Sequence, residues 1–175
     1  MILRITGSLA LHQIGIDDAA EMFRVMDSQR EHLGRWLPFV PLTRTVGDSR
    51  AFIQSVVDGS ELVFVMRFDG IYIGTVGFKE TAVDNSRTEI GYWMREDYQG
   101  RGLMTAAVRE LVRFAMEDQG IGEVFIKCAV GNERSRNIPL RLGFTFREVT
   151  PRGEYVSDGV FRDVEVYSIR TSDLL

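Results

Sequence analysis

The segment Tyr98–Thr105, YQGRGLMT, stands between two stretches with different hydrophobic periods. The residues before it, EIGYWM, are rich in the aromatic and β-branched types that are typical of a strand. The residues after it, AAVRELVRFAMED, carry apolar side chains at the spacing of an amphipathic helix. Two glycines and an arginine therefore lie where a strand passes into a helix.

The composition of this turn suits an anion. The first N–H groups of a helix have no partner within the helix, and the helix dipole places partial positive charge beside them. Gly100 and Gly102 remove side chains that would keep a ligand from these groups, and Arg101 adds a positive charge. A phosphate or diphosphate fits, although a glycine pair before a helix also occurs as a plain tight turn. The GxGxxG and GxxxxGK[ST] fingerprints are absent, so neither a Rossmann nor a Walker site is supported.

The composition predicts a single domain over residues 1–175 and a cytoplasmic location. Of the 175 residues, 45% are hydrophobic and 26% charged, which is typical of globular proteins. No apolar run approaches the roughly 20 residues that cross a bilayer, and the N-terminus lacks the layout of a signal peptide. The one cysteine, Cys128, has no internal disulfide partner and alternates with apolar residues, so we expect it on a buried strand.

The charge balance argues against direct nucleic-acid binding. The formal net charge is −4, from 21 basic and 25 acidic side chains, and no long basic run occurs. The two histidines, His12 and His32, have no metal-ligating neighbours at useful spacing, so we expect no metal and no Cys/His or Ser/His/Asp nucleophile. No membrane partner is expected, and a homodimer or higher homo-oligomer is left open.

The order of predicted elements is βααβββαβαββ. This order predicts an α/β (α+β) fold with a mixed, mostly antiparallel seven-stranded sheet, helices on both faces, and one crossover helix between the fourth and fifth strands. Asp17 is the expected cap of the first helix, and Asp69-Gly70 and Asp158-Gly159 are expected hairpin turns. The expected strands are 8–14, 61–68, 70–79, 87–94, 123–130, 144–149 and 161–169. Four helices are expected: the first begins after Asp17, the second begins near Asp48 and ends by Gly59, the third spans 102–118, and the fourth spans 134–142.

Four motifs, taken in order, resemble the GCN5-related N-acetyltransferases (GNAT). They are EIGYWM, YQGRGLMTAAVREL, KCAVGNERSRNIPLRLGFTF and GEYVSDGVFRDVEVYSI. Within that superfamily they resemble the branch that acetylates the N-terminal serine or alanine of ribosomal proteins. The resemblance runs from SLALHQI to VYSI, nearly the whole chain. It implies a GNAT fold, acetyl-coenzyme A (acetyl-CoA) as co-substrate, and direct acetyl transfer to a primary amine.

The resemblance also implies a coenzyme site. The family pattern is Gln/Arg-x-x-Gly-x-Gly/Ala. Gln99 takes its first position and Gly102 its first glycine position. Met104 stands where the general pattern has Gly or Ala, which is usual in this branch. Gly91 lies inside a strand, where a glycine marks a bulge, a close backbone approach or a packing gap. Asn132 is expected to contact the pantetheine amides, to cap a helix, or both. The implied coenzyme-binding residues are Trp93, Met94, Gln99, Gly100, Arg101, Gly102, Leu103, Met104, Thr105 and Asn132.

Two residues are assigned to proton transfer by the same resemblance. Glu154 matches the general base, and Ser135 matches the serine that protonates the leaving thiolate. An α-amine has a pKa of about 8, so a modest base acting directly or through water suffices. Without the resemblance, Glu154 would be a solvated loop charge and Ser135 a helix N-cap. Glu89 is a competing base, because many relatives use a glutamate from this strand.

The acceptor is the least determined part of the hypothesis. Trp36, Leu37 and Phe39, in REHLGRWLPFVPL, could line an acceptor groove or pack under the edge of the sheet. The leading acceptor is the α-amine of a ribosomal or other protein N-terminus. The alternatives are a small amine, such as a polyamine, amino sugar or antibiotic, and a non-catalytic CoA-binding module that controls a partner.

Overall fold

The computed structural model describes residues 1–59, 61–157 and 159–174. The chain groups into two compact units. Unit 1 comprises Met1–Gly77 and Tyr92–Ala107, and unit 2 comprises Phe78–Gly91 and Val108–Leu175. The single domain over residues 1–175 stays a prediction.

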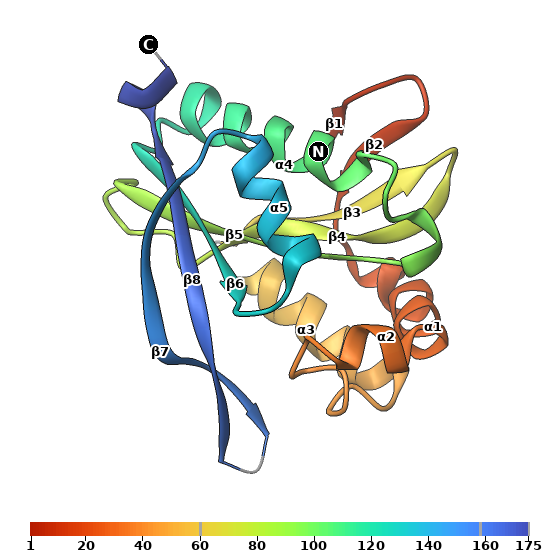
Figure 1. Ribbon diagram of the computed structural model, residues 1–175. Coiled ribbons are helices and arrows are strands. Elements are labelled where there is room, and N and C mark those ends of the chain that lie inside the picture. The colour runs from red at the N-terminus through yellow and green to blue at the C-terminus, as the bar shows by residue number, and fades with distance from the viewer. Residues whose placement is uncertain (60, 158, 175) are drawn as a thin grey trace. The chain divides into compact units, whose positions relative to one another are not determined.

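The strands form one mixed sheet in the order β1-β2-β3-β4-β5-β6-β8-β7 (Figure 1). Strands β5 and β6 are parallel, and helix α4 (Leu103–Arg113) connects them as the predicted crossover. The prediction of seven strands is wrong, because a three-residue strand, too short to show a hydrophobic period, precedes the first expected one and pairs with it. The strands are β1 (Ile2–Arg4), β2 (Leu9–Gln13), β3 (Val63–Phe68), β4 (Ile71–Lys79), β5 (Arg87–Met94), β6 (Glu123–Ala129), β7 (Thr145–Ser157) and β8 (Val160–Arg170).

The expected helices are present, with one addition. Helix α2 is a single extra turn in the segment whose prolines exclude a long helix. The helix expected over 102–118 is α-helical only to Arg113 and continues as the π-turn η3 (Phe114–Asp118). No helix among the described residues is both long and apolar enough to cross a bilayer. The other helices are α1 (Ala19–Ser28), α2 (Arg30–Gly34), α3 (Val46–Asp58) and α5 (Glu133–Arg141), with short turns η1 (Ile16–Asp18), η2 (Glu96–Tyr98) and η4 (Thr171–Leu174).

Two helix starts differ from the prediction. Asp17 lies inside η1 and does not cap α1; the carboxylate of Asp18 instead accepts a hydrogen bond from the backbone N–H of the residue before η1, at 2.9 Å. Helix α3 begins two residues earlier than expected, because Thr45 and Asp48 form a capping box. The Thr45 hydroxyl accepts from the Asp48 N–H at 3.2 Å, and the Asp48 carboxylate accepts from the Thr45 N–H at 2.8 Å.

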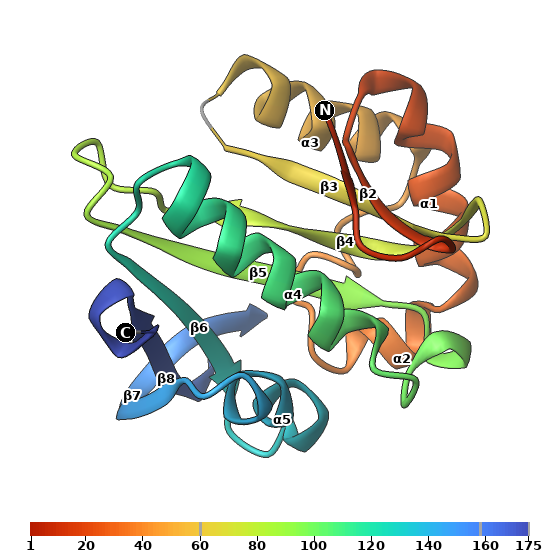
Figure 2. The same cartoon turned by 90° about the horizontal axis from the view of Figure 1, so that it is seen from above.

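The core of unit 1 lies between strands β3 and β4 and the helices α1, α2 and α3. Figures 1 and 2 show these three helices on one face of the strands and the beginning of α4 on the other. Val63 and Val65 face the three helices, while Phe64 and Met66, which alternate with them, are buried as well. A strand covered on both faces reads as a continuous apolar run, which explains the sequence VFVM.

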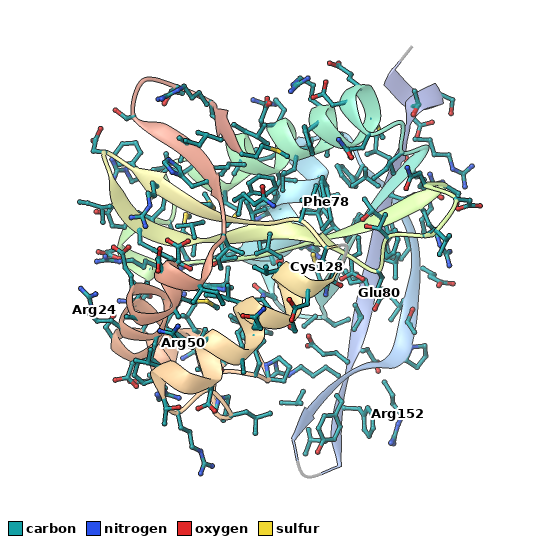
Figure 3. All side chains as sticks on the ribbon, turned by 180° about the vertical axis from the view of Figure 1, so that it is seen from behind. Arg24, Arg50, Phe78, Glu80, Cys128 and Arg152 are labelled. Atoms are coloured by element: carbon teal, nitrogen blue, oxygen red, sulfur yellow. The ribbon has the colours of Figure 1, made fainter. Side chains whose placement is uncertain are left out.

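Unit 2 is built on the antiparallel neighbours β6, β8 and β7. Strand β8 pairs with all seven residues of β6 on one side and with β7 on the other. On β4, the Phe78 ring stacks on Phe114 of η3 with ring centroids 6.3 Å apart. Cys128 is buried on β6, as predicted, and Arg152 extends from the β7–β8 hairpin, where its guanidinium lies over the Phe161 ring (Figure 3). The predicted Asp158-Gly159 turn involves residue 158, which lies outside the described residues.

Strand β4 contains a glycine at the closest backbone approach in unit 1. A Cβ atom on Gly74 would lie 2.3 Å from the Trp93 carbonyl oxygen and 2.8 Å from the Met94 Cα. Both atoms belong to the main chain of β5, so no side-chain rotation could relieve the overlap. The glycine therefore allows the end of β5, which leads into the glycine turn, to lie against β4.

We predict that Gly74→Ala destabilises the protein by about 1–3 kcal/mol, the usual cost of forcing extra volume into a packed interior. Chemical denaturation measures the change in the free energy of unfolding. Gly7→Ala is the matched control, because a Cβ at Gly7 would meet no heavy atom within 4 Å. Equal stability of the two variants would contradict the close approach.

Candidate active site

The segment YQGRGLMT forms a left-handed turn at the start of α4, in unit 1. Gly100 and Gly102 have φ angles of +74° and +75°, which side-chain-bearing residues rarely adopt. A Cβ at either position would meet nothing within 4 Å, so the backbone conformation requires glycine and the space beside the turn is open. The Ala106 N–H donates to the Gly102 carbonyl at 3.0 Å, and the amides of residues 103–105 precede this helical hydrogen bond.

These features fit the diphosphate of a coenzyme. Left-handed glycines alternating with an ordinary residue turn successive N–H groups toward one side, and the helix dipole favours negative charge there. The guanidinium of Arg101 lies over the rings of Phe68 and Tyr98, 4.7 Å and 5.5 Å from their centroids. This cation–π contact holds a positive charge next to the turn. The open space, the left-handed backbone and the nearby guanidinium are all compatible with an anion at this turn.

The side chain of Gln99 is used within the protein. Its amide nitrogen donates to the Met94 carbonyl at 3.1 Å and lies 2.9 Å from Nε2 of His32. Sequence analysis placed Gln99 at the first position of the coenzyme motif but missed His32. No sequence signal links these two residues, because 67 positions separate them.

Trp93 and Met94, at the end of β5, have buried side chains. The Trp93 ring stacks on Tyr72 with centroids 6.1 Å apart. The next residue, Arg95, donates its N–H to the Ile73 carbonyl at 2.8 Å. Because their side chains belong to the core, Trp93 and Met94 would have to meet a pantetheine arm through their main chain, as sequence analysis expects.

In unit 2, β5 and β6 pair only at their first three residues, from Arg87 opposite Glu123 to Glu89 opposite Phe125. Strand β6 continues to Ala129 along β8 instead. Gly91 follows this short pairing, and a Cβ on it would lie 3.1 Å from Cε of Lys79. The nearest atoms at Gly91 therefore belong to the flexible Lys79 side chain, and no close backbone approach is found there.

The Lys79 side chain belongs to a charge cluster around Glu89. Glu89 is almost fully buried; its Oε1 lies 2.6 Å from Lys79 Nζ, and its Oε2 lies 2.8 Å from Lys127 Nζ. Burial alone would lower the pKa of Lys127, but its hydrogen bonds and charge interactions with Glu89 and Glu80 raise it. Each oxygen of Glu89 thus forms an ion pair with an ammonium group. Like Oε2 of Glu154, Oε2 of Glu89 is buried without a well-aligned hydrogen bond among the described residues. Sequence analysis missed both lysines.

Glu154 has a different environment in the same unit. It lies in β7 opposite Arg162 of β8 and is half-buried, so a fully solvated loop charge does not describe it. Its Oε2 is inaccessible to solvent and has no hydrogen-bond partner among the described residues. Burial raises the pKa of Glu154 above its usual 4.5; Arg162 and Lys79 oppose the rise, and Glu89 adds to it. A carboxylate with a raised pKa and an oxygen without a hydrogen-bond partner is a candidate for proton transfer.

Asn132 and Ser135 lie together at the start of α5. The Asn132 side-chain oxygen accepts the Ser135 N–H at 3.3 Å, so Asn132 caps this helix, and the N-cap alternative for Ser135 is wrong. The Ser135 hydroxyl lies 3.4 Å from the thiol of Cys128. Pro139 lies inside the helix rather than near its start.

The expected site residues thus form two groups. Unit 1 holds the coenzyme motif from Trp93 to Thr105, and unit 2 holds Asn132, Ser135, Glu154 and the competing Glu89. Among the described residues, no group of three His, Cys, Asp or Glu side chains has an arrangement that could hold a metal ion.

Comparison with known proteins places this geometry in a family. The family described as acetyltransferase (GNAT) domain matches residues 8–145. The putative ribosomal N-acetyltransferase YdaF of Bacillus subtilis (strain 168) is 31% identical over 157 residues, covering 87% of this chain and 85% of that protein. The ribosomal-protein-serine acetyltransferase of Escherichia coli (strain K12) is 25% identical over 170 residues, covering 95% and 94% of the two chains.

Solved structures show the same fold. The structure of RimL, a ribosomal L7/L12 α-N-protein acetyltransferase, in complex with coenzyme A has a TM-score of 0.91 at 21% identity and covers 99% of both chains. A second structure, of a probable acetyltransferase, has a TM-score of 0.90 at 27% identity and covers 99% of this chain and 98% of the other. The predicted GNAT fold is confirmed, and the chain belongs to the GNAT acetyltransferase family.

Proposed function

We propose that this chain transfers the acetyl group of acetyl-CoA to the α-amine of a protein N-terminus, with ribosomal proteins as the acceptor class. Acetyl transfer follows from the family. The names of the B. subtilis and E. coli relatives support a ribosomal acceptor, and the CoA complex of RimL supports the coenzyme. The observation that carries the proposal is the half-buried Glu154 carboxylate, whose Oε2 has no hydrogen-bond partner among the described residues.

The coenzyme role falls to residues of the glycine turn. The amides of Gly100–Thr105, with the charge of Arg101, would hold the diphosphate, and Gln99 would keep the turn in place. The main chain of Trp93 and Met94 would border the pantetheine arm. For Asn132, the family resemblance implies a hydrogen bond from its side-chain amide to the coenzyme. Bound acetyl-CoA supplies an activated thioester, so the protein contributes positioning and proton transfer rather than a covalent intermediate.

The proton transfers fall to Glu154 and Ser135. The amine nitrogen bonds to the thioester carbonyl carbon and the carbon–sulfur bond breaks. Glu154 takes the proton that the ammonium loses before attack. After the bond to carbon forms, the nitrogen loses a second proton, and this proton replaces the one that the Ser135 hydroxyl gives to the departing thiolate. Because an α-amine has a pKa of about 8, a carboxylate with a moderately raised pKa is an adequate base. The charge of Glu89, which is paired with two lysines, adds to the rise in the pKa of Glu154.

We predict that short peptides with a free N-terminal serine or alanine are acetylated far faster than small amines. Thiol release from acetyl-CoA, followed in parallel on peptides, a polyamine and an aminoglycoside, measures the preference. The same peptides with a blocked N-terminus and a free lysine are the control for α-amine specificity. A clear preference for a small amine would overturn the acceptor assignment, and CoA binding without turnover on any amine would favour a regulatory module.

We predict that Glu154→Gln lowers kcat/KM for peptide acetylation by about 10²–10⁴-fold, the usual contribution of a general base. Glu148→Gln, an exposed position on the same strand, is the matched control and should retain activity. The wild-type rate should fall with decreasing pH through the raised pKa of Glu154, since only the carboxylate accepts a proton.

Stability provides an independent readout of the Glu154 environment. A carboxyl group whose pKa is raised on folding stabilises the protein through its protonated form, and this contribution is lost as pH rises through the folded-state pKa. Glu154→Gln should therefore raise Tm at neutral pH, and its advantage should shrink as pH falls toward 4.5. If the Tm difference between Glu154→Gln and the wild type did not change with pH, the raised pKa of Glu154 would be contradicted. This test does not depend on the activity of either protein.

A further inference from the structure

Helix α2 makes two polar connections to the turn that precedes the glycines, all within unit 1. The side-chain oxygen of Gln29, at the start of α2, accepts the Glu96 N–H at 3.0 Å. One turn later, Nε2 of His32 lies 2.9 Å from Nε2 of Gln99, and Nδ1 of His32 lies 3.5 Å from a carboxylate oxygen of Glu96. A helix far away in sequence therefore contacts both ends of η2.

The hydrogen-bond network defines the proton position on His32. The Gln99 amide nitrogen is a donor only, and it donates one hydrogen to the Met94 carbonyl at 3.1 Å. Its contact with His32 is a hydrogen bond only if Nε2 of the imidazole is the acceptor. In that tautomer the ring hydrogen is on Nδ1, the atom that lies 3.5 Å from a carboxylate oxygen of Glu96. Rotating the Gln99 amide by 180° would instead place its oxygen against the Met94 carbonyl.

The glycine turn depends on such anchors. No heavy atom lies within 4 Å of the Cβ position at Gly100 or Gly102, so side-chain packing at these positions does not fix the turn. Helix α4 holds the end at Leu103. The other end is Gln99, whose side chain ties the residue before Gly100 back to Met94 and across to His32.

We propose that His32 is a positioning residue for the coenzyme, because Nε2 of its imidazole accepts a hydrogen bond from Gln99 and thereby keeps the amides of the glycine turn in the arrangement that receives a diphosphate. This inference rests on the coenzyme role of that turn proposed above. His32 does not touch the coenzyme in this account. Its effect passes through Gln99, and its side chain is partly buried, with 24% exposed.

We predict that His32→Leu weakens the binding of CoA and raises the KM for acetyl-CoA by about tenfold, the effect of losing one hydrogen bond at an ordered site. The kcat should stay within about twofold, because no proton-transferring residue is touched. His32→Gln should restore most of the affinity, since its side-chain oxygen is a hydrogen-bond acceptor of similar reach. Calorimetry with CoA and steady-state kinetics on a peptide acceptor give these values.

His12→Leu, at the only other histidine, is the matched control and should leave CoA affinity unchanged. Wild-type affinity in His32→Leu would overturn the inference, as would a His32→Gln variant as weak as His32→Leu. The proposed function fails in a different way: it is refuted if the wild-type protein binds CoA but acetylates no amine. In that case, calorimetry on the His32 variants still tests whether His32 positions the coenzyme site. Wild-type protein that binds no CoA refutes both.

Discussion

The left-handed backbone at Gly100 and Gly102 is the constraint on which the account depends. It lies between η2 and α4, and it leaves the amides of residues 103–105 ahead of the Ala106–Gly102 hydrogen bond. Neighbouring residues adapt to this turn: Gly74 admits the end of β5, Arg101 is held over two aromatic rings, and Gln99 is tied to Met94 and His32. A ligand site made of main-chain groups needs such support, because its donors have no side-chain rotamers with which to adapt.

Unit 2 places two carboxylates in contrasting environments. Glu89 is buried deeply and neutralised by two lysines, while Glu154 is half-buried with one oxygen unused. Glu89 lies within ion-pair distance of two ammonium groups, whereas burial raises the pKa of Glu154.

Much of this could be predicted from the sequence, and the failures have physical causes. Long strands, the crossover helix and the glycine turn carry strong local signals, and the motif residues from Gln99 to Glu154 follow a family pattern. Strand β1 and helix α2 are too short to show a hydrophobic period. His32, Lys79 and Lys127 act through partners distant in sequence, so no local pattern reveals them. Gly74 could have been found by the rule that drew attention to Gly91, since both are glycines inside strands.

The central claim is that the amides of the glycine turn bind the diphosphate of the coenzyme. The most direct measurement is the change in backbone amide chemical shifts on titration of the protein with CoA, followed by NMR. The account predicts that the largest, saturable changes occur at Gly100–Thr105. Saturable binding of CoA with unperturbed amides at Gly100–Thr105 would contradict it.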